Sequence, residues 1–502
     1  MTARLRVLQD EIHGRISPRL YGHFAEHLGR CCYDGLFVGK NSSIPNIEGF
    51  RKDVVEALRD MPTPMLRWPG GCYADHYHWK DGIGADRPIR LGMSCGLQVL
   101  DTNELGTDEF LTLCALIGAE PYLAGNMGSS SPEELCHWIE YCNTALPTAL
   151  AQQRRANGQD EPYGVKLWGI GNENWGCGGN YDAESYALEY RRYSLMAQHV
   201  DPTIEMVCCG HDTDWNRRCI DKLRNHLGFV DHYSIHRYWI NGGHGTDFSE
   251  DEYYALLDEA DKTEDFIIET RQFLDEASGG RRHVGIALDE WGVWHSEARN
   301  WGPGGSATES NDYTQPCTMR DAVATAIGFE VFHRQSSSLS MANLAQIVNV
   351  LHAPIMTDGE AMWLTPTYHV LSLNQGHIGG DAYRVEVEGG PMLPNGTPAI
   401  SATATMAMIT LVNRHMTETI EVEIPAPYCM GQVLAADRPN AQNSVTEKPV
   451  RLETLPGTVD GDVVRVVLPP CSVGTQHRPF CRHTWKRRFP SSKISRLDKN
   501  AR

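Results

Sequence analysis

Two glutamates, Glu173 and Glu290, follow short apolar segments of the sequence, at 166–170 and 284–288. Apolar runs of about four to eight residues are typical of strands that are buried on both faces of a sheet. A carboxylate at the end of such a strand would lie at the mouth of a parallel barrel, where barrel enzymes carry out their chemistry. Two carboxylates delivered there by different strands could cleave a glycosidic bond, one as proton donor and the other as nucleophile.

Further polar and aromatic side chains follow the other predicted strands. Such groups cost free energy when they crowd one rim of a barrel, unless they bind each other or a polar ligand. A sugar would offer hydroxyl groups to the polar side chains and C–H faces to the aromatic rings, so the pattern favours a sugar as the ligand. The set comprises Glu26, Arg67, Cys72, Asn172, His236, Tyr238 and Gln346.

Some of these residues also have a purely structural interpretation. Glu26 could be an ion-pair partner of Arg67, His236 could be a satisfied histidine of the barrel, and Tyr238 could serve only to pack. Arg67 is expected to serve both purposes, because its charge would orient a glutamate and lower the pKa of that carboxyl group. We favour a site role for each of them.

A metal site is the alternative interpretation for one segment. Cys72, His76 and His78 lie close together in the sequence and are of types that bind zinc. They lack a further ligand at a recognisable spacing, so we expect neither a metal nor a cofactor. The aromatic residues of 73–79 are expected to wall a pocket instead.

The composition limits the class of protein. A chain of 502 residues with 41% hydrophobic and 22% charged residues is typical of a soluble globular protein with two or more domains. The net charge of −19 argues against a nucleic-acid surface, which would need a basic face. The first residues contain no apolar core of a signal peptide, and no stretch approaches the roughly 18 apolar residues that would span a membrane.

The 15 cysteines are odd in number and scattered, without a CxxC pair. We therefore expect reduced cysteines, mostly buried as small hydrophobic residues, in a cytoplasmic protein. A disulfide framework is the disfavoured alternative.

Apolar runs alternate with helix-length amphipathic segments over about 330 residues. This alternation predicts a (β/α)8 barrel of the TIM type. A doubly wound open sheet is the competing layout, but no GxGxxG turn follows the first run. The predicted strands cover 20–24, 64–68, 121–124, 166–170, 204–208, 230–235, 284–288 and 344–350.

From about residue 383 the segments become shorter, often alternate between apolar and polar residues, and are separated by Gly, Pro and Asn. This pattern is typical of an all-β sandwich. We predict an N-terminal strand within 1–15 that joins the sandwich, a catalytic barrel at 16–375 and the sandwich at 376–480. The basic segment 481–502 is expected to be a disordered tail.

Five motifs occur in a recognisable order. They are Gly-His-Phe-Ala-Glu-His-Leu-Gly at 22–29, Arg-Trp-Pro-Gly-Gly at 67–71, Trp-Lys-Asp-Gly-Ile-Gly at 79–84, Gly-Ile-Gly-Asn-Glu-Asn at 169–174 and Leu-Asp-Glu-Trp at 288–291. Over residues 1–480 the chain resembles the α-L-arabinofuranosidases of glycoside hydrolase family 51. The resemblance implies a catalytic barrel with a C-terminal sandwich of jelly-roll type, retention of anomeric configuration, no cofactor, and homo-oligomers that are often hexamers.

The resemblance also assigns roles by position. Glu173 matches the general acid/base of the family, Glu290 matches its nucleophile, and Arg67 matches the arginine near the nucleophile. The residues that match those holding the arabinose ring are Glu26, Asn172, Tyr238 and Gln346. Cys72 departs from the pattern, because many members have asparagine after Trp-Pro-Gly-Gly, and one sugar contact is therefore altered.

The expected function is that of a retaining, exo-acting α-L-arabinofuranosidase that acts on arabino-oligosaccharides. Retention predicts a carboxyl separation of about 5–5.5 Å between Glu173 and Glu290. A β-xylosidase or an endoglucanase with the same barrel is the rival enzyme. A carbohydrate-binding or scaffold protein with a degenerate barrel is disfavoured, because both carboxylates are present.

Overall fold

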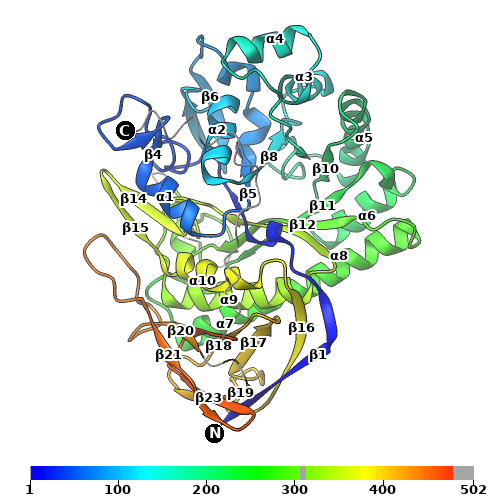
Figure 1. The fold of residues 1–502 in the computed structure, drawn as a ribbon. Helices are drawn as coiled ribbons and strands as arrows, with labels where there is room; N and C mark the ends of the chain where they lie inside the picture. Colours follow the sequence, from blue (N-terminus) through cyan, green and yellow to red (C-terminus); the bar gives the residue numbers. More distant parts are fainter. Residues whose placement is uncertain (1, 303, 306–311, 427, 429, 479–502) are drawn as a thin grey trace.

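The computed structural model describes residues 2–478 except 303, 306–311, 427 and 429; the predicted basic tail lies outside this part. Eight parallel strands close into a barrel, in the upper part of Figure 1. In chain order they are β2 (Gly22–Phe24), β5 (Met65–Trp68), β8 (Glu120–Gly125), β9 (Leu167–Ile170), β10 (Glu205–Cys208), β11 (His232–Trp239), β12 (Gly285–Val293) and β13 (Leu339–Ala345).

Helices surround this barrel, and several begin at a side chain that caps free backbone N–H groups. Ser131 and Asp212, for example, accept from the backbone N–H groups of Glu134 and Trp215. None of the helices in the described ranges is long and apolar enough to cross a membrane. The helices are α1 (Lys52–Asp60), α2 (Thr107–Ile117), α3 (Pro132–Asn143), α4 (Ala149–Ala156), α5 (Ala183–Val200), α6 (Thr213–Leu223), α7 (Glu250–Asp261), α8 (Thr263–Ser278), α9 (Met319–Arg334) and α10 (Pro366–Asn374).

Short elements decorate the strand ends of the barrel. The 3-10 helices η2 (Cys72–His76) and η3 (Trp79–Gly82) follow β5, and the hairpin of β6 (Arg90–Ser94) and β7 (Leu97–Asp101) comes after them. Two further two-stranded sheets pair β3 (Asn46–Ile47) with β4 (Phe50–Arg51) and β14 (Ile355–Asp358) with β15 (Ala361–Leu364). These connections carry several of the residues that line the site.

An apolar cluster fills the inside of the barrel. Six strands each contribute one buried side chain to it: Met65, Tyr122, Leu167, Val207, Ala287 and Met341. A packed interior of this kind leaves no pore, so polar chemistry is confined to the end of the barrel where the strands finish.

A ten-stranded sheet forms the second unit, at the bottom of Figure 1. Its first strand, β1 (Ala3–Arg15), pairs antiparallel with β16 and parallel with β19. The sheet folds over itself, because Leu455 of β21 and Leu468 of β23 both lie against Gly474 of β24. The C-terminal strands are β16 (Asp381–Gly389), β17 (Ile400–Ala404), β18 (Met408–Asn413), β19 (Ile420–Pro425), β20 (Met430–Ala435), β21 (Arg451–Pro456), β22 (Thr458–Asp460), β23 (Val463–Leu468) and β24 (Ser472–His477).

Helix α9 lies between the barrel and this sheet (Figure 1), and its residues from Met319 to His333 are buried. Within this interface Glu330 accepts a hydrogen bond from Arg414 over 3.0 Å. The predicted fold class, a closed parallel barrel followed by an all-β unit, is confirmed.

The predicted eighth strand was misplaced. The strand covers Leu339–Ala345 rather than 344–350, because the polar residues Ser340 and Asn343 interrupt the apolar pattern of the true strand. The segment that followed the apolar pattern, including Ile347 and Val348, is buried in a loop after the strand. Because this loop is buried against the barrel, its residues are apolar, and they gave the same sequence pattern as a buried strand.

The prediction that the cysteines are reduced is wrong for one pair. Cys72 and Cys177 form a disulfide, with Cα atoms 5.5 Å apart and a sequence separation of 105. The other described cysteines are free, and all but Cys95 are buried, as expected. The loops after β5 and β9 bring the pair together, and sequence spacing does not reveal this proximity. Cys429 and Cys481 lie outside the described residues.

Candidate active site

The predicted site residues all lie at the end of the barrel where the strands finish. Glu26 follows β2, Cys72 begins η2 after β5, and Gln346 follows β13. The others belong to strands or follow them directly: Arg67 (β5), Asn172 and Glu173 (after β9), His236 and Tyr238 (β11), and Glu290 (β12). Hydrogen bonds and ion pairs join six of these side chains into one network, and Glu26 and Gln346 form a separate hydrogen-bonded pair. The six are Arg67, Asn172, Glu173, His236, Tyr238 and Glu290.

An irregularity in β12 lets two adjacent carboxylates, Asp289 and Glu290, both point to the inner side of the barrel, where each lies near Arg67. Successive side chains of a regular strand point to opposite faces. Between β11 and β12 the register shifts, so that Ile235 pairs with Leu288 but His236 pairs with Glu290. The extra residue, Asp289, lies inside the barrel, where it accepts hydrogen bonds from Tyr122 and Asn343.

Glu290 accepts hydrogen bonds at both carboxylate oxygens. Arg67 donates to Oε1 over 2.8 Å, and the hydroxyl of Tyr238 donates to Oε2 over 2.8 Å. Burial by itself would raise the pKa of Glu290, but the charges of His236 and Arg67 and these hydrogen bonds outweigh it and lower the pKa. A buried carboxylate held ionised in this way is available as a nucleophile.

Glu173 lies in a sharp turn directly after β9. Its backbone is left-handed, with φ at 42°, which is uncommon for a residue other than glycine. The turn directs its Oε1 to within 2.9 Å of His236 Nδ1, and the same nitrogen lies 3.6 Å from Oε2 of Glu290. Oxygens of the two glutamates and the histidine nitrogen all lie within 4.8 Å of one another.

Glu26 is buried on the other side of the cluster. Its Oε1 accepts hydrogen bonds from the backbone N–H of Tyr73 and the hydroxyl of Ser94, and its Oε2 accepts one from Gln346. Burial and the charge of Glu290 raise the pKa of Glu26 to about 7, against the opposing effect of these hydrogen bonds. Gly71 leaves room for the carboxylate, because a Cβ atom there would collide with it.

Three buried polar atoms of the site lack a hydrogen-bond partner among the described residues: Nε of Arg67, Nδ2 of Asn172 and Oε1 of Gln346. The first lies 3.6 Å from a carboxylate oxygen of Asp289, so the other two are the atoms open to a ligand. Asn172 already accepts a hydrogen bond from Arg67 through Oδ1, and Gln346 already donates to Glu26, so both side chains are fixed in orientation. Unpaired buried polar groups are rare and costly, and a ligand with hydroxyl groups would satisfy them.

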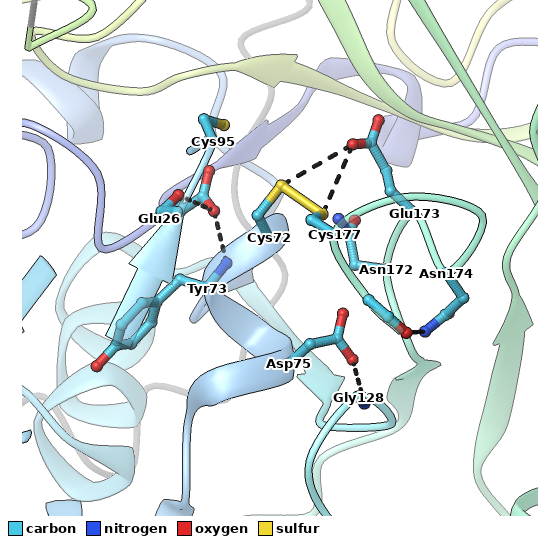
Figure 2. The surroundings of a disulfide bond; sticks show 12 residues. Glu26, Cys72, Tyr73, Asp75, Cys95, Gly128, Asn172, Glu173, Asn174 and Cys177 are labelled. Carbon is cyan, nitrogen blue, oxygen red and sulfur yellow. Dashed lines mark hydrogen bonds between the residues drawn. A yellow bond between two sulfur atoms is a disulfide. The ribbon is translucent and has the colours of Figure 1, made fainter. Parts of the chain in front are cut away.

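The disulfide borders the site next to Glu173. Figure 2 shows that its sulfur atoms face the carboxylate, and Oε2 of Glu173 lies 4.0 Å from Sγ of Cys72 and 3.9 Å from Sγ of Cys177. The loop that carries Cys177 packs closely against Asn172 and Asp75. A Cβ atom at Gly178 would collide with both residues, so glycine is needed there. This close approach holds Cys177 beside Cys72.

Sequence reasoning missed several residues of this cluster. Asp289 was visible as the neighbour of Glu290, but only the register shift shows that it also lies inside the barrel. Ser94 and Cys177 come from loops, where the sequence gives no periodicity that would place a side chain. Tyr122 looked like an ordinary apolar residue of its strand.

Two protein-family models match this chain. The family model of the α-L-arabinofuranosidase 1 domain matches residues 57–243, and the family model of the α-L-arabinofuranosidase C-terminal domain matches residues 289–472. The chain is 37% identical over 498 residues to an intracellular exo-α-L-arabinofuranosidase of Bacteroides ovatus, covering 94% of this chain and 95% of the relative. It is 32% identical to α-L-arabinofuranosidase C of Emericella nidulans, covering 83% of this chain and 86% of that protein.

Solved structures agree with the sequence comparisons. The crystal structure of the family 51 arabinofuranosidase of Xanthomonas axonopodis pv. citri superposes with a TM-score of 0.87 at 33% identity, covering 95% of this chain and all of the other. An arabinose complex of the α-L-arabinofuranosidase of Thermotoga maritima superposes with a TM-score of 0.83 at 32% identity, covering 95% of this chain and 99% of the other. The resemblance drawn from the motifs is confirmed, and the chain belongs to the α-L-arabinofuranosidases of glycoside hydrolase family 51.

Proposed function

We propose that this enzyme removes terminal non-reducing α-L-arabinofuranosyl residues from arabino-oligosaccharides by double displacement. Glu290 is the nucleophile and Glu173 is the general acid/base. The observation that carries this proposal is the approach of their carboxylate oxygens to within 4.8 Å. Retaining glycosidases keep the two carboxyl groups about 5–5.5 Å apart, whereas inverting enzymes need about 6.5–9.5 Å to admit a water molecule.

The first step forms a covalent intermediate. Glu290 attacks the anomeric carbon, and the bond to the leaving oxygen breaks as Glu173 transfers a proton to that oxygen. The hydrogen bonds from Arg67 and Tyr238 support this assignment, because they favour the ionised form of Glu290 before attack. His236 lies between the two glutamates and can stabilise the negative charge that each carries in turn.

The second step releases arabinose. Glu173, now ionised, removes a proton from water, and the resulting hydroxide attacks the anomeric carbon as Glu290 departs. Two displacements on the same carbon restore the original anomeric configuration.

Three side chains of the cluster are suited to hold the sugar ring. Glu26 offers carboxylate oxygens to hydroxyl groups, and the unpaired atoms of Asn172 and Gln346 offer one donor and one acceptor. Because each is fixed by a neighbouring protein group, the ring would bind to a preformed set of partners. Preformed partners reduce the entropy that binding costs.

The exo mode and a cytoplasmic location draw support from the Bacteroides ovatus relative, which is described as intracellular and exo-acting. A cytoplasmic enzyme would receive short, imported oligosaccharides rather than polymers. Assembly into a homo-oligomer belongs to the same proposal, and light scattering on the purified chain tests it.

A substrate panel tests the proposal directly. p-Nitrophenyl α-L-arabinofuranoside is expected to be hydrolysed far faster than the corresponding β-xyloside and β-glucoside. Faster hydrolysis of the xyloside or the glucoside would favour the rival enzyme classes. Defined arabino-oligosaccharides should lose single arabinose units from the non-reducing end, and internal cleavage products would contradict the exo mode.

A further inference from the structure

The two cysteines of the disulfide next to Glu173 differ from the other described cysteines in bonding, and one of them also differs in its exposure to solvent. Cys177 is exposed to solvent, and Cys72 is 7% exposed, whereas the free cysteines are buried or half-buried. A dissolved thiol can therefore reach one sulfur of the pair. Figure 2 shows the disulfide between the carboxylates of Glu26 and Glu173. A change in the redox state of the two cysteines would therefore alter the surroundings of both carboxylates.

Exchange with a dithiol would open this bond. The attacking thiolate displaces one sulfur, its partner thiol then completes the exchange, and the dithiol leaves as a disulfide. Two electrons and two protons pass to the protein, which then carries two thiols beside Glu173. Disulfides of cytoplasmic proteins are rare, and those that exist are commonly transient, so reversible opening fits the proposed location.

We propose that the reduced Cys72 and Cys177 form, together with Glu173, an inhibitory site for a thiophilic divalent cation such as Zn²⁺, and that the disulfide closes this site. One ligand atom from each of the three residues lies within 4.8 Å of the other two. Zinc holds thiolate sulfur at about 2.3 Å and carboxylate oxygen at about 2.0–2.2 Å, so atoms this close need only small movements to share one ion.

The donor set suits the ion. Thiolates select zinc and similar soft cations, and a carboxylate completes three positions of a tetrahedral site with water in the fourth. Binding releases the two thiol protons. The inhibitory effect rests on the acid/base role proposed for Glu173: a carboxylate bound to the cation cannot carry the proton that the leaving group needs.

Histidines outside the active site could also bind zinc, and the experiment has to distinguish such binding from the proposed site. A cavity of about 860 Å³ beside η2 is lined by His76, His78 and His137 together with Glu133 and Glu134. Occupancy there would not depend on the redox state of the cysteines. His137→Ala therefore serves as the matched control for Cys177→Ser.

The experiment uses the full-length purified chain, once oxidised and once reduced with a phosphine, which adds no thiol of its own to the metal. The phosphine becomes its oxide with oxygen from water, and the disulfide takes up two electrons and two protons. Co²⁺ serves as the spectroscopic probe for thiolate ligation, and Zn²⁺ serves as the probe for inhibition. Alkylation of Cys72 and Cys177, read by mass spectrometry with and without Zn²⁺, gives a measurement on the unmodified sequence.

The reduced protein should bind one Co²⁺ per chain with a thiolate-to-cobalt charge-transfer band, and Zn²⁺ should inhibit it at least tenfold more strongly than the oxidised protein. Zn²⁺ should also protect both cysteines from alkylation. Cys177→Ser should lose the band and the redox-dependent inhibition, while His137→Ala should keep both.

Two results would overturn the inference: equal zinc inhibition of the oxidised and reduced protein, or full inhibition of reduced Cys177→Ser. Failure of the proposed function looks different. A cobalt band and protection from alkylation without any loss of activity would establish the site but contradict the acid/base role of Glu173. Normal activity with no cobalt band would leave that role intact and refute the site.

Discussion

Nδ1 of His236 lies 2.9 Å from Oε1 of Glu173. The same nitrogen lies 3.6 Å from Glu290, so one imidazole contacts both carboxylates of the proposed reaction. Burial would lower the pKa of His236, but the charges of Glu290 and Glu173 outweigh burial and raise it. The protonated histidine in turn lowers the pKa of Glu290, which couples the two glutamates electrostatically.

Replacement of the nucleophile should stop the reaction at its first step. Glu290→Ala is expected to lower kcat by at least about 10⁴-fold, because no covalent intermediate can form. Azide added to this variant should attack the substrate directly and give the β-arabinofuranosyl azide. Formation of the α azide would show that another residue supplies the nucleophile.

Replacement of the acid/base should depend on the leaving group. Glu173→Ala is expected to slow oligosaccharide hydrolysis by about 10²–10⁴-fold and activated aryl arabinofuranosides much less, since only the former need a proton at bond cleavage. Azide should rescue this variant and give the α azide, because it attacks the intermediate. An equal loss on both substrate kinds would remove Glu173 from the acid role.

Removal of one hydroxyl group should shift the pH profile. Tyr238→Phe deletes the hydrogen bond to Oε2 of Glu290, and so raises the pKa of that carboxyl group. A hydrogen bond to a charged group is worth about 1.5–3 kcal/mol, which corresponds to about one pH unit or more. Because the nucleophile must be ionised, the acidic limb of kcat/KM should move to higher pH by about this amount.

The matched control lies on the same strand. Tyr233 also belongs to β11, but its hydroxyl donates to Asn216 outside the site. Tyr233→Phe should therefore leave the acidic limb unchanged. A shift of equal size in both variants would trace the effect to β11 as a whole rather than to Glu290.

The interface between the barrel and the C-terminal sheet offers a test of stability. Arg414 donates to Glu330, which is fully buried. Arg414→Ala is expected to lower the free energy of unfolding by about 3–5 kcal/mol, because the buried carboxylate loses its ion-pair partner and keeps only the hydrogen bond from Ser401. The double variant Glu330→Leu with Arg414→Met should lose less, since no fully buried charge remains unpaired. Asp261, the other partner of Arg414, is only half-buried and stays 3.8 Å from Arg334. Thermal unfolding compares the two proteins, and an equal or larger loss in the double variant would contradict the argument that the unpaired buried charge is what lowers the stability.

The sequence predicted the fold class and the assembly of the site for a clear physical reason. Parallel strands buried on both faces give continuous apolar runs, and the residues after them, such as Glu173, must gather at one end of the barrel. The bounds of strand β13 were predicted wrongly, because Ser340 and Asn343 interrupt its apolar run. The buried loop residue Val348 extended the apolar pattern beyond the end of the strand.

Contacts between loops could not be predicted in the same way. The pairing of Cys72 with Cys177 depends on how two connections fold over the barrel, and no periodicity records that. The register shift at Asp289 likewise depends on pairing with the neighbouring strand. Such features follow from tertiary packing and become visible only in three dimensions.

The anomeric configuration of the product tests the central claim most directly. With methanol present as an acceptor, proton NMR of the first product formed from an α-L-arabinofuranoside should show methyl α-L-arabinofuranoside, because two displacements at the anomeric carbon restore the starting configuration. Methyl β-L-arabinofuranoside as the first product would show a single displacement, and would contradict the roles given to Glu173 and Glu290.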